Sequence, residues 1–412
     1  MPHRELLVAA CSLLLIVAGA NADESMHELK VSTSFPGGSA TVESIDSDAG
    51  VIHIHPAVHP GQGWPCWWYL RIDGLKKGQA LTLKVSKNTK PFRAKRILSA
   101  DWAQPIQAAI STDNVTWTQT PGHRKEGGVA VYEFETTAKT IWLAWGPPFL
   151  PSHAEALLKK IARSLPDSER FELARTRGDR AVHGIRIGSG SYGVWVQTRQ
   201  HAWEAGSSWV GRGFIEWTAS DDPAAIALRK TATIHFVPIM DIDNVAVGAG
   251  GKDAIPRDHN RDWSDKPVYP EVAAAQAKIQ KFDGANRFDF FLDLHNPGPN
   301  EKRPYFFGPM NLDKLPSIQQ RNHARWLAIS RELISDPLPL ASDYKFATYV
   351  KTEEERNRMS SNWVRNHTSD HVLSTTLETV WNTPQSTQQG YQAVGRQLAQ
   401  SVARYLSNNP RN

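Results

Sequence analysis

A histidine and a glutamate stand three residues apart in the segment HAWE, at His201 and Glu204. The segment follows the apolar run YGVWV, which is typical of a buried strand. An imidazole and a carboxylate presented together at a strand end can hold a metal ion. Gly and Ser also flank the pair, so the segment alone is equally typical of a solvated loop.

Three more segments place polar side chains at or after apolar, strand-like runs. His295 follows FDFFLDL, Glu378 lies within STTLETVW, and DHNRDW ends a glycine-rich loop that follows TIHFVPI. In a sheet of parallel strands, such ends meet at one edge, where ligands bind. Core packing does not explain the grouping, because Asp, Glu and Arg are seldom buried without partners.

This set of side chains suits zinc-dependent hydrolysis. A catalytic zinc takes three protein ligands and keeps one position open for water, and two histidines with one glutamate form a known ligand set. We therefore expect one zinc ion, held by His201, Glu204 and His295. Glu378 is the candidate to accept a proton from the water, because zinc lowers the pKa of bound water to about 7.

The elements that carry these residues form the second part of the chain. From residue 151, apolar strand-like runs alternate with helix-like segments, which predicts an α/β domain whose mixed, mostly parallel sheet is flanked by helices. Prolines end the preceding strand, and Ser152 can cap a helix over 154–165. We expect further helices at PEVAAAQAKIQKF, SIQQRNHARWLAISRELI and STQQGYQAVGRQLAQSVARYL.

The first part of the chain has the pattern of short strands and turns that is typical of an all-β protein. Runs such as ATVESI, GVIHIH, ALTLKVS and VAVYEFET are separated by Gly, Pro, Asn and Asp. Their regular spacing, without helical periodicity, predicts an all-β sandwich. We therefore divide the chain into a signal peptide at 1–22, a β-sandwich domain at 23–150 and a catalytic domain at 151–412.

The first 22 residues are typical of an export signal. A basic start precedes an apolar stretch from Leu6 to Ala18, and small residues follow at Ala20–Ala22. The stretch is too short for a membrane span of about 20 residues, so we expect a periplasmic or secreted protein. VAAC, ending at Cys11, resembles a lipoprotein box, but it precedes most of the apolar run. Export ranks first, and lipidation of Cys11 stays open.

The net charge and its distribution say little about the binding partners of the protein. The net charge is +5 at pH 7, and basic and acidic residues are interspersed along the 412 residues. This distribution does not indicate nucleic-acid binding. The sequence does not define the oligomeric state.

The four segments together resemble the zinc metallocarboxypeptidase family. In that family an H-x-x-E pair, an Asn–Arg pair followed by an aromatic residue, a His after Asp–Leu and a Glu in a late strand occur in this order. Here they read HAWE, NRDW, DLH and TLET. The first part, with CWWYLRIDGLKKGQALTLKV and LAWGPPFLPS, is similar to the β-sandwich of the cytosolic carboxypeptidase branch, which includes enzymes acting on glutamate-rich tails.

The resemblance implies further roles. It implies hydrolysis of the C-terminal bond of a peptide or protein, with Glu378 as general acid and base. Asn260 and Arg261 would bind the terminal carboxylate, since a guanidinium pairs with a carboxylate in two parallel hydrogen bonds. Asp258 would accept the second ring N–H of His201 and so fix its tautomer.

The chain also departs from the family pattern. Ala202 and the large Trp203 stand between the two ligands of HAWE, where the family has Pro–Gly or a basic residue. The arginine that polarises the scissile carbonyl is not evident, and Lys252 or Arg257 are candidates to replace it. The tyrosine that covers the substrate is not evident either; Trp363 and Arg365 occupy roughly that stretch, and Tyr344 and Tyr349 lie further back.

Two other functions stay open. One is a zinc amidase or deacylase that acts on a non-peptide or cell-wall amide. The other is an inactive binding protein of the same fold, which the missing arginine and tyrosine favour and the intact ligands and Glu378 oppose. HIHPAVH, at 53–59, is a rival metal segment, but it lacks an acidic neighbour in sequence. No G-x-S-x-G or phosphate-loop spacing occurs in the chain.

Overall fold

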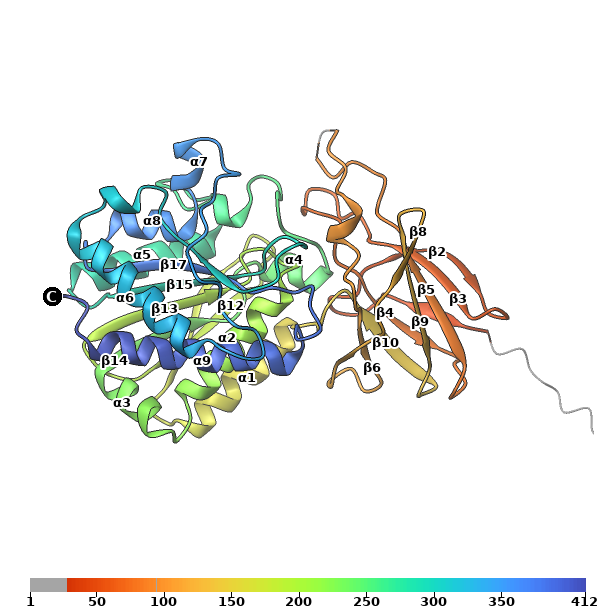
Figure 1. The fold of residues 1–412 in the computed structure, drawn as a ribbon, viewed down its shortest axis with the longest axis horizontal. Helices are drawn as coiled ribbons and strands as arrows, with labels where there is room; N and C mark the ends of the chain where they lie inside the picture. The colour runs from red at the N-terminus through yellow and green to blue at the C-terminus, as the bar shows by residue number, and fades with distance from the viewer. Residues whose placement is uncertain (1–27, 94) are drawn as a thin grey trace, which may run out of the picture.

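The computed structural model describes residues 28–93 and 95–412. Figure 1 shows a β-rich part beside a larger part built of helices around a sheet. The expected signal peptide, with Cys11, lies outside the described residues. Within the described part, no helix combines the length and apolar character that a membrane crossing needs.

Two five-stranded sheets form the N-terminal part. One contains, in order, β1 (Lys30–Ser32), β4 (Tyr69–Asp73), β10 (Thr140–Ala144), β6 (Ala109–Ser111) and β7 (Thr118–Gln119). The other contains β2 (Thr41–Asp46), β3 (Val51–His55), β5 (Ala80–Val85), β9 (Val129–Glu135) and β8 (Arg124–Glu126). Alternate side chains of facing strands enter one core; Leu83 of β5 and Ile141 of β10 are both fully buried. The predicted sandwich is confirmed.

A seven-stranded mixed sheet forms the centre of the C-terminal part. Its order is β11 (Glu169–Arg175), β12 (Ala181–Ile187), β14 (Ala232–Val237), β13 (Tyr192–Thr198), β15 (Phe290–His295), β17 (Leu373–Glu378) and β16 (Tyr305–Phe307). The four neighbours from β14 to β17 are mutually parallel, whereas β12 and β16 pair antiparallel at either side. The predicted α/β class is therefore confirmed, although β11 and β12 were not expected.

Helices cover both faces of this sheet, as Figure 1 shows for α1 and α9 on one side and α5 and α8 on the other. The first layer consists of α1 (Pro151–Ser164), α2 (Ala205–Thr218), α3 (Pro223–Thr231), α6 (Ser317–Leu333) and α9 (Gln388–Ser407). The second contains α5 (Pro270–Gly284) and α8 (Ser360–His367). Successive side chains of each strand point to opposite faces of the sheet and so enter the two hydrophobic cores. Val196 packs with the first helix layer and Trp195 with the second. Shorter helices are α4 (Ile242–Val247) and α7 (Glu353–Asn357), with 3-10 turns at Ala100–Trp102, His259–Arg261 and Leu312–Lys314.

Helix α2 was not expected from the sequence. It begins directly after Glu204, contains three glycines and is buried on nearly every side, so it shows no amphipathic periodicity. Its glycines allow close packing on α9. A Cβ at Gly213 would lie 2.1 Å from the carbonyl oxygen of Gln392, and one at Gly395 would lie 1.9 Å from that of Val210.

The sandwich holds one loop of the C-terminal part by main-chain hydrogen bonds. The amide of Trp64 donates to the carbonyl of Lys252 (3.0 Å), and the amide of Gly251 donates to that of Gln62 (2.8 Å). Gly63 has φ +92°, and a Cβ there would lie 2.4 Å from the Lys252 carbonyl oxygen. The position of Lys252 thus depends on contact between the two parts.

Candidate metal centre

Among residues 28–93 and 95–412, the structure brings together one group of side chains that could hold a metal ion: His201, Glu204 and His295. One ligand atom from each lies within 4.8 Å of the others, and all three residues are buried. His201 follows β13, Glu204 caps α2, and His295 ends β15. These are the segments in which the sequence predicted the ligands.

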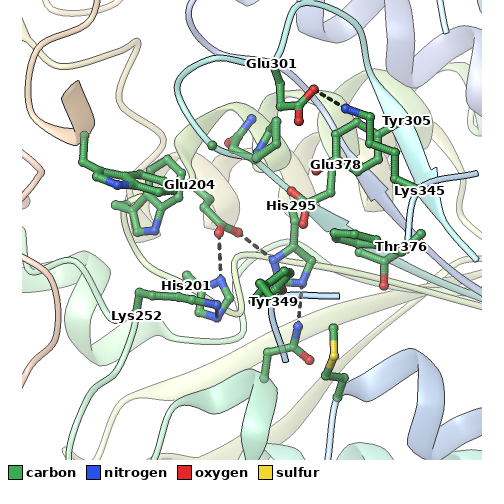
Figure 2. A pocket seen from close by; sticks show the side chains of 18 of the residues that line it. His201, Glu204, Lys252, His295, Glu301, Tyr305, Lys345, Tyr349, Thr376 and Glu378 are labelled. Carbon is green, nitrogen blue, oxygen red and sulfur yellow. Dashed lines mark hydrogen bonds and ion pairs between the residues drawn. The ribbon is translucent and has the colours of Figure 1, made fainter. Parts of the chain in front are cut away.

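The donor atoms fit a divalent cation. Nδ1 of His201 and Nδ1 of His295 lie 2.7 and 2.8 Å from the two oxygens of Glu204 (Figure 2). Apart from this contact with His295, the buried Oε2 of Glu204 has no hydrogen-bond partner. Burial alone would raise the pKa of Glu204, but the two imidazoles lower it to about 2. Two imidazoles together with one ionised carboxylate form a known zinc ligand set.

Carboxylates orient both imidazoles from behind. Nε2 of His201 lies 3.0 Å from Oδ1 of Asp258, and Nε2 of His295 lies 3.1 Å from Oδ2 of Asp293. A carboxylate in this position favours the tautomer with the proton on Nε2, which leaves Nδ1 free on the side of Glu204. The structure thus places Asp258 where the sequence expected it. Asp293 was missed, although its spacing two residues before His295 on a strand puts both side chains on one face.

Glu378 lies beside the ligands. It ends β17 and is the register partner of His295 on β15. Its Oε2 is buried without a hydrogen-bond partner. Burial, opposed by His295 and reinforced by Glu204, raises the pKa of Glu378 to about 7. A carboxyl group with such a pKa can accept and return a proton near neutral pH.

These residues open onto a cavity of about 440 Å³. Figure 2 shows Glu301 and Lys345 toward one end of it and Tyr349 toward the other. The lining comprises Trp64, Trp102, His201, Trp203, Glu204, Lys252, Asn260, His295, Asn296, Pro297, Gly298, Glu301, Tyr305, Phe307, Lys345, Phe346, Tyr349, Met359, Thr376 and Glu378. Such a volume accommodates one or two amino-acid side chains rather than a folded protein surface.

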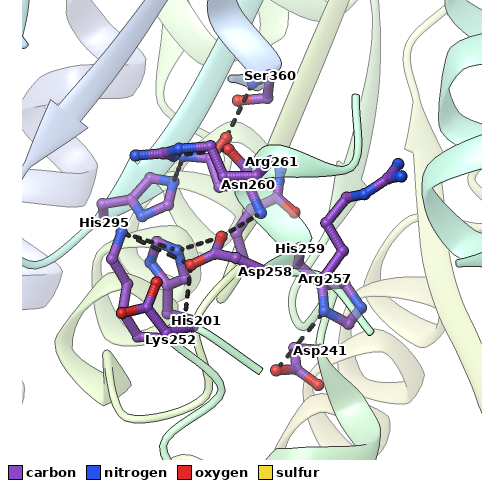
Figure 3. A network of polar contacts seen from close by, with 12 residues as sticks. His201, Asp241, Lys252, Arg257, Asp258, His259, Asn260, Arg261, His295 and Ser360 are labelled. Carbon is purple, nitrogen blue, oxygen red and sulfur yellow. Dashed lines mark hydrogen bonds and ion pairs between the residues drawn. The ribbon is translucent and has the colours of Figure 1, made fainter. Parts of the chain in front are cut away.

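The structure distinguishes the two candidates for the cation that polarises the scissile carbonyl. Nζ of Lys252 lines the cavity, 3.3 Å from Nε2 of His201 and 3.8 Å from Oδ2 of Asp258 (Figure 3). Arg257 does not line it: its guanidinium donates to Oδ1 of Asp262 at 2.9 Å. The structure therefore gives no support to a substrate contact by Arg257, because that ion pair turns the side chain away from the cavity.

Asn260 and Arg261 lie at one end of the site. The side-chain amide of Asn260 lies 3.4 Å from Nε2 of His295, and its oxygen accepts the amide N–H of Ser360 at 2.9 Å (Figure 3). Arg261 lies behind the lining and donates to the carbonyl of Asn260 at 2.8 Å. Burial would lower the pKa of Arg261, but Asp258, Tyr349 and Glu355 raise it.

A buried histidine holds this segment in place. His259 lies between two carboxylates, 2.7 Å from Glu271 and 3.8 Å from Asp241, and stacks on Tyr269 at 3.8 Å. Burial would lower the pKa of His259, but these carboxylates raise it to about 9. The resulting imidazolium ties the turn that carries Asn260 to α4 and α5.

Some of the aromatic candidates line the cavity and others do not. Trp203 lines the cavity and is 1% exposed, so it belongs to the site. Tyr349 also lines it, whereas Tyr344 is bonded to His323 and Trp363 packs on Trp263 in the core. Arg365 does not line the cavity.

Sequence reasoning missed Tyr305, Glu301 and Lys345. Tyr305 pairs with Glu378 in the register of β16 and β17, so the strand-like run PYFFG carried a signal for it. Glu301 and Lys345 form an ion pair but lie in segments without a sequence motif.

Comparison with known proteins identifies relatives of both parts. Residues 154–408 match the family model described as zinc carboxypeptidase, and residues 31–145 match the cytosolic carboxypeptidase N-terminal domain. An uncharacterised protein of Zymomonas mobilis is 24% identical over 309 residues, covering 73% of this chain and 76% of that protein. Human cytosolic carboxypeptidase 6 is 22% identical over 249 residues, covering 56% of this chain and 49% of the relative. The chain thus spans about half the length of that relative.

Solved structures show the same fold. A metallo-carboxypeptidase from Burkholderia cenocepacia superposes with a TM-score of 0.77 at 21% identity, covering 92% of this chain and 99% of that one. Because the catalytic-domain family model matches more than half of the residues, the assignment does not depend on that distant likeness. The chain belongs to the zinc carboxypeptidase family and is a metallocarboxypeptidase.

Proposed function

We propose that this protein removes the C-terminal residue of peptides or proteins, with one zinc ion held by His201, Glu204 and His295. The observation that carries the proposal is that three buried ligand atoms, one from each of these residues, lie within 4.8 Å of one another, with both imidazoles oriented by other carboxylates. Zinc in such a site supplies Lewis acidity, which polarises a carbonyl and makes water a nucleophile near neutral pH.

Glu378 serves as the proton carrier. Its unpartnered oxygen borders the cavity beside His295, and a pKa raised to about 7 suits both the uptake and the return of a proton. It accepts the proton of the attacking water and delivers it to the leaving amine. Such general acid–base catalysis contributes about 10²–10⁴-fold to a rate.

Asn260, Arg261 and Tyr349 bind the terminal carboxylate. Asn260 borders the cavity, Tyr349 lines it, and the charged Arg261 lies directly behind. Arg261 already contacts Glu355 at 3.3 Å, but Glu355 is 51% exposed, so a substrate carboxylate can replace that weak partner. This arrangement requires a free carboxylate and therefore an exopeptidase.

Lys252 stabilises the negative charge that develops on the scissile carbonyl oxygen. Its ammonium lines the cavity next to His201, and the main-chain bonds to the sandwich hold its loop. A fixed cation at a developing oxyanion is a large contributor to catalysis. The β-sandwich thus takes part in building the site.

We also propose that the protein is exported, on the basis of its first 22 residues. N-terminal sequencing of protein from a native host should find a chain beginning at Asp23 in the periplasm or medium. An intact Met1 on cytoplasmic protein would contradict export, and a lipid on Cys11 would support the lipoprotein alternative.

The proposed activity can be tested with a peptide library that varies the C-terminal residue. Each peptide is offered with a free and with an amidated C-terminus, with and without a zinc chelator. We expect cleavage of free peptides only, loss with chelator, and loss of at least about 10²-fold in Glu378→Gln. Glu133→Gln, an exposed position on the sandwich, is the matched control.

Other outcomes distinguish the alternatives. Equal cleavage of amidated peptides would indicate an amidase that does not need the carboxylate. Stoichiometric zinc without turnover on any peptide would indicate a binding protein and refute the proposal.

A further inference from the structure

Three tryptophans form one side of the cavity, and two of them come from the β-sandwich. Trp64 and Trp102 meet edge to face with ring centres 4.7 Å apart, and Trp102 meets Trp203 in the same way at 5.6 Å. All three line the cavity. We call these residues the aromatic wall.

Contacts behind the wall fix it in place. The indole N–H of Trp64 donates to Asp253 at 3.0 Å, across the boundary between the two parts. Trp203 is 1% exposed and packs edge-on against Trp145, with ring centres 5.3 Å apart. Rings held in this way offer a preformed apolar surface, so a ligand that packs on it loses little conformational freedom of the protein.

The wall lies on the amino side of the bond to be cleaved. In the proposed function, the terminal carboxylate binds at the Asn260 end and the scissile carbonyl lies at the three ligands. The remaining lining must then receive the residue that precedes the bond. Trp203 and Pro297 each follow a ligand by two residues and so border that region.

The side facing this region carries charges that already have partners. Glu301 and Lys345 form an ion pair, seen at the upper end of the cavity in Figure 2. Nζ of Lys345 also lies 4.4 Å from the centre of the Tyr305 ring. An acidic side chain here would meet the Glu301 carboxylate. The lining's other ammonium, on Lys252, already contacts His201 at 3.3 Å and Asp258 at 3.8 Å.

We infer that the enzyme selects an aromatic or large apolar side chain at the residue before the scissile bond and discriminates against an acidic one. The inference rests on the proposed function. An aromatic ring in this position packs on the indoles in the edge-to-face or offset geometry that such pairs prefer. A run of glutamates is accordingly a poor substrate.

The test compares N-acetylated dipeptides that share the best C-terminal residue from the library and carry Phe or Glu before it. We expect kcat/KM to favour Phe by at least about tenfold, the order expected for burying one aromatic side chain. Trp102→Leu should lower the Phe/Glu ratio by about tenfold. Glu301→Gln should lower it several-fold by releasing Lys345. Because each result is a ratio within one protein, partial misfolding does not affect it.

Trp142→Leu is the matched control, since Trp142 is a partly buried tryptophan of β10 that does not line the cavity. It should leave the ratio unchanged. A ratio near one in the parent protein, or an unchanged ratio in Trp102→Leu, would overturn the inference and leave the proposed function intact. No cleavage of any peptide would overturn both.

Discussion

Asp258 and Asp293 both contact a histidine ligand, yet replacing each by asparagine should have different results. Oδ1 of Asp258 accepts from His201 (3.0 Å) and from the amide of Asn260 (2.8 Å), and Oδ2 accepts from the amide of Asp253 (3.0 Å). Both oxygens are acceptors. An asparagine at position 258 has only one acceptor oxygen. Its NH₂ group would replace the other oxygen and would face an N–H donor of the surrounding protein.

Asp293 differs because it uses a single oxygen. Its Oδ2 faces His295 (3.1 Å) and accepts from Gln200 (3.2 Å) and from the hydroxyl of Ser360, whereas Oδ1 is buried without a partner. Asp293→Asn can therefore keep every contact, although its NH₂ group is then buried without an acceptor at a cost of about 1–3 kcal/mol in stability.

We therefore expect Asp258→Asn to weaken zinc binding about 10–100-fold, or roughly 1.4–2.7 kcal/mol, since it destabilises the His201 tautomer that leaves Nδ1 free. Asp293→Asn should weaken zinc binding less and lower the unfolding free energy of the apoprotein instead. Zinc affinity is measured by competition with a chromophoric chelator, and stability by urea unfolding. Weaker zinc binding in Asp293→Asn than in Asp258→Asn would refute this reasoning.

Three further predictions concern catalysis, acid stability and packing. Lys252→Met should lower kcat by about 10²-fold or more with little change in KM, and Lys252→Arg should restore part of it; a change confined to KM would exclude the oxyanion role. Burial raises the pKa of Asp289, but His371, Arg411 and the amide of Gly193 together lower it below its usual value. Its stabilising contribution is therefore present above the unfolded pKa of about 3.9 and is lost as the pH falls below it, so Asp289→Asn should flatten the acid limb of the stability curve. Gly395→Ala should cost at least about 1–3 kcal/mol in urea unfolding because its Cβ would overlap α2, whereas Gly284→Ala on α5, where nothing lies within 4 Å, should be neutral or stabilising.

The sequence was sufficient for elements whose pattern is local. The alternating runs of the sandwich and the apolar runs of β13, β15 and β17 follow from side-chain periodicity, which needs no knowledge of distant contacts. Helix α2 escaped prediction because its glycines and all-round burial follow from its contact with α9, more than 170 residues later in the chain.

The site shows the same division. The residue types and order of HAWE, DHNRDW, DLH and TLET indicated the candidate metal ligands, the proposed proton carrier and the proposed carboxylate-binding pair, because each of these is a short motif. Lys252 and Arg257 could not be distinguished, since they are five residues apart in one loop and only the ion pair with Asp262 shows which of them faces away. Asp293, Tyr305 and the aromatic wall depend on strand register and on contact between the two parts. Chemistry at the metal position was therefore determined by the sequence, whereas the shape of the cavity, and with it the proposed substrate preference, was decided by tertiary packing.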